Sequence, residues 1–356
     1  MSIITEDVDG VLGRLTGDRL DPLAGGTMLV TGAGGFLAGY LVDTVARANR
    51  RGLLSPPCGL RLLVRRQPRE GDRLGHLLDR PDVSFIVADV NSDYPLDAGL
   101  THIVHAASAA SPRAYGHDPL GTIDANTAAL RRLLAHAAAH DLRSLLYLSS
   151  SEVYGDPPPE DIPTSEAYPG RAEFTGPRAC YAESKRFGET LCDVFHRVFR
   201  VPVKVVRPFH VYGPGLRLDD GRIVPELIRQ GLQDGALRLL SDGRATRCYG
   251  YAADATYGFL LALLSEHQGT AFNIGVDEPQ TSIGELAAMV AEIFGLPAPE
   301  PATQPLPEHL RGAPHNSRPN LARARELLGY RSWTPLRAGL ERTVEWFRAA
   351  EVAGAT

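Results

Sequence analysis

A short apolar strand that runs into a glycine-rich turn and then into a helix places the strongest limit on the fold of this chain. The strand is Thr27–Thr31, the turn spans Gly32–Gly39, and apolar positions continue beyond it at helical spacing. Gly32 permits the tight turn, Gly35 lets the backbone approach a diphosphate, and the helix N-terminus offers unpaired amides to phosphate oxygens. A glycine turn can also be an ordinary loop, but the strand and helix around it favour a dinucleotide site.

Short apolar runs alternate with helical patterns along the chain. The runs lie at 60–64, 83–88, 102–107, 144–149 and 203–207. This alternation is typical of a parallel sheet covered on both faces. We therefore predict an α/β fold, a Rossmann-type doubly wound parallel sheet with a smaller C-terminal α/β lobe. We expect an N-terminal arm over 1–26, a dinucleotide-binding domain over 27–207 with a return segment at about 250–275, and an interleaved substrate-binding lobe over 208–350.

A tyrosine and a lysine four residues apart form the candidate catalytic pair. Tyr181 and Lys185 fall on one face of a predicted helix, so the ammonium could lower the pKa of the phenol toward neutral pH and make it a proton acceptor. The same spacing occurs by chance in amphipathic helices. The hydroxyl run Ser149–Ser151 and the upstream glycine turn favour catalysis here. Lysine is also rare, since the chain has only Lys185 and Lys204.

The composition restricts the partners of the protein. A net charge of −5 and a pI near 6.1 argue against general nucleic-acid binding, which requires a basic face. No apolar run approaches the length of a bilayer span, and the first residues do not resemble a secretory signal. We expect a cytoplasmic protein that binds neither nucleic acid nor membrane. The four cysteines lack metal-binding spacing, so we predict reduced thiols and no metal.

The predicted cofactor site extends beyond the glycine turn. After the second strand, where an NAD site usually has an acid, the chain has Arg65-Arg66, which could hold the 2′-phosphate of NADP or be a solvated pair. We predict NAD, with NADP as the alternative. Asp89 could bind the adenine amine or cap a turn, and His105 is expected to be packed beneath the cofactor. The predicted cofactor-binding residues are Gly32, Gly35, Phe36, Leu37, Arg65, Asp89, Val90, Ala106, Ala107, Tyr181, Lys185 and Pro208.

With these motifs, the sequence from Met28 to Phe347 resembles the extended short-chain dehydrogenase/reductases that modify nucleotide sugars. Several segments look most like the UDP-glucuronate decarboxylases, which make UDP-xylose. These segments are Ser151–Pro157, Gly176–Tyr181 with Lys185-Arg186, Ala110–Pro112 with Tyr115, Asp220–Val224, Thr246-Arg247 with Tyr251 and Asp254, and Pro319–Gly329. The chain departs from the family pattern at Arg65-Arg66, at His210 where an asparagine is common, at Ala109, and at Cys248 or Tyr249. A changed sugar substrate is therefore an open alternative.

The resemblance implies a transient oxidation of the sugar. Tyr181 beside Lys185 would take the proton of the sugar 4-hydroxyl while a hydride passes to the nicotinamide, and Ser150 would hydrogen-bond the same oxygen. The ketone at carbon 4 would turn the neighbouring carboxylate into a β-keto acid that loses carbon dioxide. The enolate would then be stabilised and reprotonated, and the hydride would return.

The pair Ser151-Glu152 favours decarboxylation among the reactions of this family. Simple 4-epimerases commonly have a small residue at the second position, and 4,6-dehydratases pair an aspartate with a glutamate. An added aspartate would repel a carbon-6 carboxylate, whereas Ser151 could donate to it. Glu152 could instead be a structural carboxylate at a strand end. Epimerase, dehydratase and a non-catalytic dinucleotide sensor are the alternatives. The predicted catalytic residues are Tyr181, Lys185, Ser150, Ser151 and Glu152.

The resemblance also implies a nucleotide-sugar site and a homodimer. The predicted substrate-binding residues are Ser111, Tyr115, Arg178, His210, Arg222 and Arg247. Arg222 and Arg247 are candidates for the diphosphate, although isolated arginines are more often surface residues. Relatives usually dimerise through a four-helix bundle. Apolar positions in the predicted helices 120–139 and 181–199 suit either an interface or the core, namely Leu130, Leu134, Leu191 and Phe195.

Overall fold

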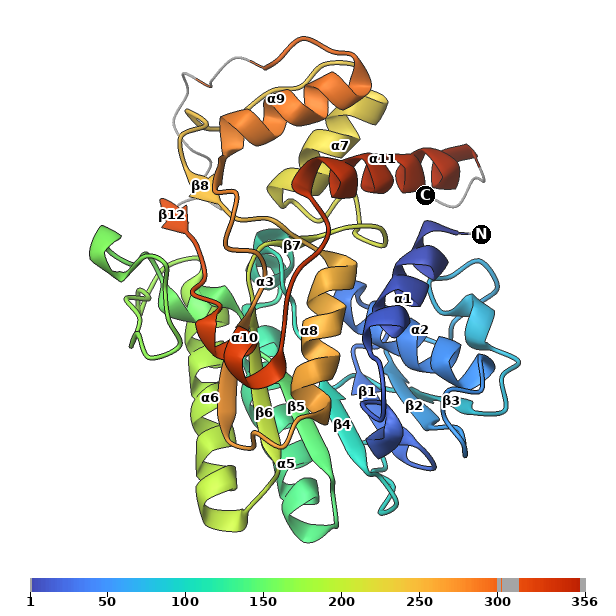
Figure 1. Ribbon diagram of the computed structural model, residues 1–356. Helices are drawn as coiled ribbons and strands as arrows, with labels where there is room; N and C mark the ends of the chain where they lie inside the picture. The colour runs from blue at the N-terminus through green and yellow to red at the C-terminus, as the bar shows by residue number, and fades with distance from the viewer. Residues whose placement is uncertain (1, 300–301, 303–313, 353–356) are drawn as a thin grey trace.

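A seven-stranded parallel sheet lies at the centre of the computed structural model, which describes residues 2–299, 302 and 314–352 (Figure 1). The strand order is β10-β6-β5-β4-β1-β2-β3, and every neighbouring pair is parallel. The strands are β1 Thr27–Thr31, β2 Gly59–Val64, β3 Val83–Val87, β4 His102–His105, β5 Ser144–Leu148, β6 Val203–Pro208 and β10 Thr270–Ile274. The strand order reverses between β1 and β4, which is where open α/β sheets bind ligands. The predicted fold class is confirmed.

Both faces of the sheet are buried. Since side chains alternate along each strand, every strand contributes to the core on both faces. Met28 and Val30 of β1 belong to one core cluster, whereas Leu29 between them belongs to the other. The first cluster includes residues of α1, α2 and α8, and the second includes residues of α5 and α6. The continuous apolar runs in the sequence therefore reflect strands covered on two sides.

The helices include the two predicted over 120–139 and 181–199. They are α1 Ile3–Arg14, α2 Phe36–Arg50, α3 Pro112–His117, α4 Pro119–Asp124, α5 Leu130–Ala139, α6 Ala179–Phe199, α7 Ile223–Gln233, α8 Ala252–Leu264, α9 Ile283–Phe294, α10 Ala322–Leu328 and α11 Leu336–Val352. A π-helical turn at Ala125–Ala129 joins α4 to α5. Helix α8 was not predicted, because it is buried on every side from Ala252 to Leu263 and so lacks an amphipathic period.

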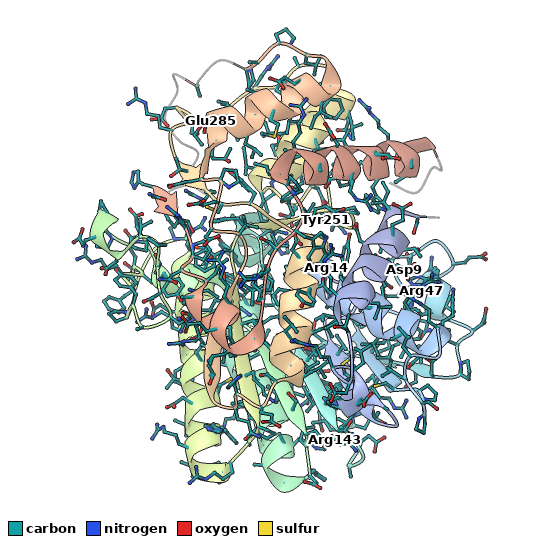
Figure 2. The ribbon with its side chains drawn as sticks, viewed as in Figure 1. Asp9, Arg14, Arg47, Arg143, Tyr251 and Glu285 are labelled. Atoms are coloured by element: carbon teal, nitrogen blue, oxygen red, sulfur yellow. The ribbon has the colours of Figure 1, made fainter. Side chains whose placement is uncertain are left out.

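The N-terminal segment, predicted as an arm, contains α1, which packs against α2 and α8. Asp9 of α1 forms an ion pair of 2.8 Å with Arg47 of α2 (Figure 2). The buried carboxylate of Asp7 accepts hydrogen bonds from Tyr40 at 2.9 Å, Tyr251 at 2.8 Å and Arg342 at 2.8 Å. Helix α1 therefore connects the sheet-covering helix α2 to α11.

A second group of elements lies beyond the carboxyl end of β6 (Figure 1). Helix α9 packs against α7, α11 and β11 of a small three-stranded sheet of order β11-β8-β12, and β7 pairs with β9. These strands are β7 Val211–Tyr212, β8 Thr246–Arg247, β9 Gly250–Tyr251, β11 Thr281–Ser282 and β12 Asn316–Ser317. Within the described ranges, no helix combines the length and hydropathy that a bilayer span requires.

Candidate active site

The glycine turn lies at the point where the strand order reverses. Gly32 has a φ of +66°, and a Cβ there would lie 2.8 Å from Cα of Ala107, so only glycine fits. Thr31 Oγ1 accepts from the amides of Ala106 and Ala107, each at 3.2 Å, and holds the end of β4 beside the turn. A side chain at Gly34 would meet nothing within 4 Å, which leaves open space above the turn.

The N-terminus of α2 suits a diphosphate. Gly35 is the N-cap of α2 and contributes no side-chain cap, so the first amides, including those of Phe36 and Leu37, have no partner within the helix. Unpaired amides and the helix dipole favour an anion at this position. The residues of the turn therefore fit the diphosphate of a dinucleotide.

The residues predicted for the adenosine end are only partly available. Arg66 donates to Asp72 at 2.8 and 3.1 Å, whereas Arg65 is exposed and forms no ion pair within the described part of the chain. Asp89 accepts a hydrogen bond from the amide of Asn91 at 2.9 Å. It therefore caps a turn, which was the predicted alternative to binding the adenine amine. Val90 packs against the second core cluster, and Pro208 ends β6. Contacts of these residues with a cofactor stay predictions.

His105 is a packed histidine. Its Nδ1 lies 2.8 Å from Thr31 Oγ1, its Nε2 lies 2.9 Å from the carbonyl oxygen of Ala125, and its ring stacks on Tyr147 at 5.8 Å. Burial lowers the pKa of His105 to about 3, so the ring is neutral at pH 7. Neither ring nitrogen is available as a base.

Helix α6 and the segment after β5 bring the candidate catalytic side chains together. Tyr181 and Lys185 are 6% and 2% exposed, and Lys185 Nζ lies 5.8 Å from the centre of the Tyr181 ring. Lys185 donates to the carbonyl oxygen of Leu148 at 2.6 Å, at the end of β5. Ser150 follows two residues later, caps a 3-10 turn over Ser151–Tyr154, and is close enough to Tyr181 to act on the pKa of its phenol.

The pKa of the candidate base differs from the expected direction. Burial raises the pKa of Tyr181 to about 12, although hydrogen bonding with Ser150 acts to lower it. Burial also lowers the pKa of Lys185 to about 7. The expectation that the ammonium of Lys185 lowers the pKa of the phenol toward neutral pH is therefore wrong, because desolvation of the buried phenol outweighs the groups that lower its pKa. Ionisation of Tyr181 near pH 7 requires a further positive charge beside it.

Glu152 is paired with Arg178, which precedes α6. The guanidinium donates to the two carboxylate oxygens at 2.5 and 3.2 Å, and the side chains are 22% and 16% exposed respectively. A bidentate pair of this kind balances the charge of the carboxylate. The sequence predicts catalysis for Glu152 and substrate binding for Arg178, whereas the structure pairs the two side chains.

Aromatic and hydroxyl side chains of the Ser111–Tyr115 region line the same site. The Tyr115 ring stacks on Tyr181 with centroids 5.2 Å apart and planes 15° apart. The Tyr115 hydroxyl is buried and has no hydrogen-bond partner among the described residues. Ser111 caps α3 by accepting from the amide of Ala114 at 3.4 Å. Tyr115 therefore holds the phenol of Tyr181 in place, and the hydroxyl of Ser111 is used within its own helix.

Three of the predicted substrate-binding residues lie close together beyond β6. Burial and the charges of Arg247, Arg178 and Arg222 hold the pKa of His210 well below its usual value, so the imidazole is neutral. His210 Nε2 is buried and has no partner within the described residues. The guanidinium of Arg247 donates to the carbonyl oxygens of Thr246 at 2.7 Å and His315 at 3.2 Å.

The two arginines differ in their partners. Arg247 is 7% exposed and forms no ion pair with a described carboxylate, and burial lowers its pKa. Arg222 is paired with Asp220 and would have to exchange this partner to bind a diphosphate. Arg247 has no ion-pair partner to exchange, but the carbonyl oxygens of Thr246, Pro314 and His315 already accept from its guanidinium, so it too would have to give up hydrogen bonds to bind a diphosphate.

Sequence reasoning missed the residues that support the segment carrying Ser150. Ser149 donates to Glu189 at 2.5 Å, and Glu189 is paired with Arg207. One signal pointed to Glu189, because it lies four residues after Lys185 on the same face of α6. The sequence held no signal for Arg207 as its partner.

A glycine turn at the reversal of strand order, with a serine, a tyrosine and a lysine at the end of β5 and on α6, defines a dinucleotide-dependent enzyme of the short-chain dehydrogenase/reductase class. The chain belongs to the NAD dependent epimerase/dehydratase family, which matches residues 28–275. The resemblance inferred from the sequence is confirmed.

Relatives with assigned names share most of the chain. UDP-glucuronic acid decarboxylase 1 of Xenopus tropicalis is 32% identical over 321 residues, which cover 90% of this chain and 72% of the relative. UDP-glucuronic acid decarboxylase 1 of Arabidopsis thaliana is 33% identical over 321 residues, covering 90% and 69%. The structure of UDP-glucuronic acid 4-epimerase from Bacillus cereus in complex with UDP-glucuronic acid and NAD is similar, with a TM-score of 0.76 and 25% identity. The similar region covers 91% of this chain and 99% of the Bacillus cereus chain.

Proposed function

We propose that this protein is a lyase that decarboxylates UDP-glucuronate through a transient ketone at carbon 4, with NAD as the recycled cofactor. The observation that carries the proposal is the convergence of Ser150, Tyr181 and Lys185 beside the Glu152–Arg178 pair. The similarity to proteins named UDP-glucuronic acid decarboxylase supports the same reaction.

The chain has a fitting place for NAD. The turn at Gly32 and Gly35 and the first amides of α2 would hold the diphosphate, and Ala106 and Ala107 would lie beside the dinucleotide. When bound, NAD supplies a hydride acceptor and a positively charged nicotinamide ring. Arg65 would lie near the adenosine ribose, which keeps NADP as the alternative.

Tyr181 acts as the general base on the sugar 4-hydroxyl. Because burial raises the pKa of Tyr181 to about 12, the phenol ionises only when positive charge is added to the site. Lys185, whose pKa burial lowers to about 7, is partly an ammonium at neutral pH and contributes part of that charge. Ser150 hydrogen-bonds the same oxygen and orients it toward the phenolate.

Loss of carbon dioxide results from the oxidation of carbon 4. The carbon-6 carboxylate is then β to a ketone, so the bond between carbons 5 and 6 breaks and its electron pair moves to the carbon-4 oxygen. Ser150 and Tyr181 donate to this enolate oxygen, and a proton returns to carbon 5. Arg178 balances the negative charge of Glu152, so Glu152 does not repel the carboxylate of the substrate. Ser151 can then donate a hydrogen bond to the substrate carboxylate.

The elements that contain residues 208–350 form the substrate-binding lobe in this proposal. Arg247 and Arg222 would bind the diphosphate, with His210 beside them and Tyr115 against the sugar. Residues 27–207 with the return segment near 250–275 would form the cofactor-binding domain. This division is consistent with β10 pairing with β6 in the main sheet.

The product mass separates the candidate reactions. The protein is incubated with UDP-glucuronate and NAD, and the nucleotide sugar is weighed by mass spectrometry. Loss of the mass of carbon dioxide is expected. An unchanged mass with an inverted carbon 4 would assign a 4-epimerase. A parallel incubation with UDP-glucose, which unlike UDP-glucuronate has a carbon-6 hydroxyl to lose, would assign a 4,6-dehydratase by loss of water. Tight dinucleotide binding without any turnover would assign a sensor.

The 4-epimerase is the second candidate, because the similar Bacillus cereus structure is named as a UDP-glucuronic acid 4-epimerase. Decarboxylation and epimerisation share the ketone at carbon 4 and differ in the fate of that ketone. Ser151, beside a Glu152 whose charge is balanced, would hold the substrate carboxylate in place. A fixed carboxylate favours loss of carbon dioxide over the rotation of the ketone that epimerisation requires.

We also propose a homodimer formed through α4 and α6. Phe187, Val198 and Phe199 of α6 are 53%, 61% and 55% exposed, and Leu120 of α4 is 73% exposed. The second core cluster contains or is packed against by the four positions predicted to suit either an interface or the core: Leu130, Leu134, Leu191 and Phe195. Light scattering after gel filtration is expected to give twice the chain mass, and Phe187→Glu with Val198→Glu the mass of one chain. The cytoplasmic location and the lack of nucleic-acid and membrane partners stay predictions.

A further inference from the structure

Helix α6 is fastened to the segment that carries the catalytic hydroxyls at three points. Lys185 donates to the carbonyl oxygen of Leu148 at 2.6 Å, and Arg186 donates to that of Val153 at 2.9 Å. Between them, Ser149 donates to Glu189 at 2.5 Å. Because Tyr181 is on α6 and Ser150 is on this segment, these bonds set how the two residues face each other.

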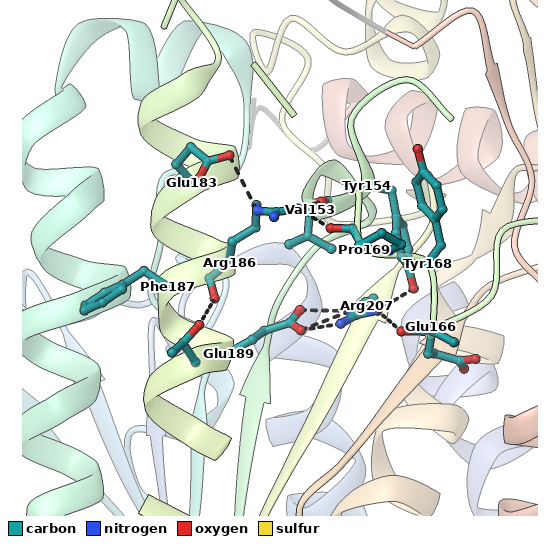
Figure 3. Close-up of a pocket in the computed structure, with 12 residues that line it drawn as sticks. Val153, Tyr154, Glu166, Tyr168, Pro169, Glu183, Arg186, Phe187, Glu189 and Arg207 are labelled. Atoms are coloured by element: carbon teal, nitrogen blue, oxygen red, sulfur yellow. Dashed lines mark hydrogen bonds and ion pairs between the residues drawn. The ribbon is translucent and has the colours of Figure 1, made fainter. Parts of the chain in front are cut away.

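One ion pair holds both ends of the segment. Arg207 of β6 donates to the Glu189 carboxylate through Nε at 2.9 Å and Nη2 at 2.5 Å (Figure 3). The same guanidinium donates through Nη1 to the hydroxyl of Tyr154 at 2.6 Å. Ser149 comes just before the N-cap Ser150 of the 3-10 turn Ser151–Tyr154, and Tyr154 is the last residue of that turn.

The far end of this network is anchored in the main sheet. The Tyr154 hydroxyl donates to Asn273 of β10 at 2.7 Å. The amide group of Asn273 donates in turn to the carbonyl oxygens of Thr164 at 3.0 Å and Asn320 at 3.2 Å. The network therefore connects the catalytic segment to an edge strand and not only to α6.

We propose that Glu189 is a positioning residue, which with Arg207 holds the segment Ser149–Tyr154 against α6 so that Ser150 and Tyr181 meet the same substrate oxygen. The inference rests on the proposed function for the identity of that oxygen. It assigns Glu189 no contact with substrate or cofactor. The negative charge of Glu189 also opposes the loss of the proton from buried Lys185.

The surroundings of the pair allow it to be tested without unfolding the protein. Arg207 and Glu189 are 12% and 15% exposed, and both line a cavity of about 450 Å³ with Tyr168, Phe187 and Thr190 (Figure 3). Because Glu166, Glu183 and Arg186 also line this cavity, water held in it can solvate Arg207 after a substitution at Glu189. The chain is therefore expected to fold without the ion pair.

The test uses Glu189→Gln, in which Ser149 and Arg207 compete for one remaining oxygen. Its kcat for UDP-glucuronate with NAD is expected to fall about 100-fold with KM within about twofold, since misplaced catalytic groups slow the reaction more than they weaken binding. Hydrogen exchange of the amides in 149–154 is expected to accelerate. Ser149→Ala should lose about 10-fold in kcat, and Ser149→Thr, which keeps the hydroxyl, should recover most of it.

A matched control is available at the opposite end of the sheet. Arg80 and Asp82 form an ion pair of 2.6 Å with 14% and 12% exposure, close to the values of the Glu189–Arg207 pair. Asp82→Asn is expected to lower the melting temperature to a similar extent, with kcat within about twofold and unchanged exchange in 149–154.

Two results would overturn the inference. One is wild-type kcat and exchange in Glu189→Gln. The other is a loss of kcat accompanied by faster exchange across the whole chain, which would make the pair a general support of the fold. If the wild-type protein does not turn over UDP-glucuronate, the proposed function fails instead. The exchange measurement uses no substrate and still decides whether Glu189 holds the segment.

Discussion

The two lysines of this chain are buried at opposite ends of the same sheet. Lys185 and Lys204 are each 2% exposed. Lys185 lies at the carboxyl end of β5, where it donates to the carbonyl oxygen of Leu148 at 2.6 Å. Lys204 lies near the start of β6 and donates to Ser144 Oγ at 3.0 Å. Both lysines are thus buried in spite of the desolvation cost of an ammonium group, although only Lys185 has catalytic neighbours.

The difference lies in what surrounds each ammonium. Lys185 faces the rings of Tyr181 at 5.8 Å and Tyr147 at 4.8 Å, and burial lowers its pKa to about 7 against the opposing charge of Glu189. Burial alone lowers the pKa of Lys204 to about 8. A perturbed pKa therefore does not identify a site by itself. A lysine identifies a site when it also lies beside a hydroxyl, a phenol and open space for a ligand.

The largest effect is expected for the base at the carboxyl end of the sheet. Tyr181→Phe removes the only group proposed to take the proton from the sugar, so kcat should fall by about 1,000-fold or more. Steady-state kinetics with UDP-glucuronate measure this change. Dinucleotide affinity, followed by fluorescence titration, should be little altered. Retained turnover would contradict the role of Tyr181.

The two lysines provide the direct comparison. Lys185→Met should lower kcat about 100-fold, because the ammonium that favours the phenolate is lost. Lys204→Met should leave kcat within about twofold. Both variants are assayed with the same substrate at pH 7. Equal losses in the two variants would mean that the comparison between the two ends of the sheet is wrong.

Stability should show the opposite contrast. The pKa of Lys204 is about 8 when folded and 10.5 in its ordinary setting, so the unfolded chain holds this proton more tightly. The wild type should therefore be less stable than Lys204→Met by roughly 3 kcal/mol at and below pH 7, and the deficit should shrink as pH rises from about 8 to about 10.5. Urea denaturation of both proteins at pH 7 and pH 9 measures the difference. A deficit that does not change with pH would exclude the titration of Lys204 as its cause.

The smallest effect concerns a cation that is not buried at all. Arg65 is exposed at the carboxyl end of β2 and has no ion-pair partner in the described ranges. Arg65→Asp should weaken NADP binding about fivefold and leave NAD binding unchanged or slightly improved, since an exposed pair contributes about 1 kcal/mol or less. Titration with both dinucleotides decides this. Arg66→Asp is the matched control, because Arg66 is already paired with Asp72.

Most of the fold could be predicted from local patterns in the sequence. The glycine turn, the strand runs and the Tyr181–Lys185 spacing depend on residues within a few positions of each other, where backbone geometry is the main determinant. Helix α9 likewise starts at a local signal, the capping box that Ser282 and Glu285 form. Helix α8 was missed because uniform burial removes the periodic signal.

The α/β class, the dinucleotide turn, the family and the identity of the candidate base and lysine could all be predicted from the order of the residues. Which charges meet could not, because the partners are distant along the chain and only folding brings them together. Glu152 pairs with Arg178 across 26 positions, Ser149 with Glu189 across 40, and Asp7 with Arg342 across 335. The pKa of Tyr181 likewise lies above 10 because desolvation depends on everything packed around the ring, and no spacing along the chain encodes it.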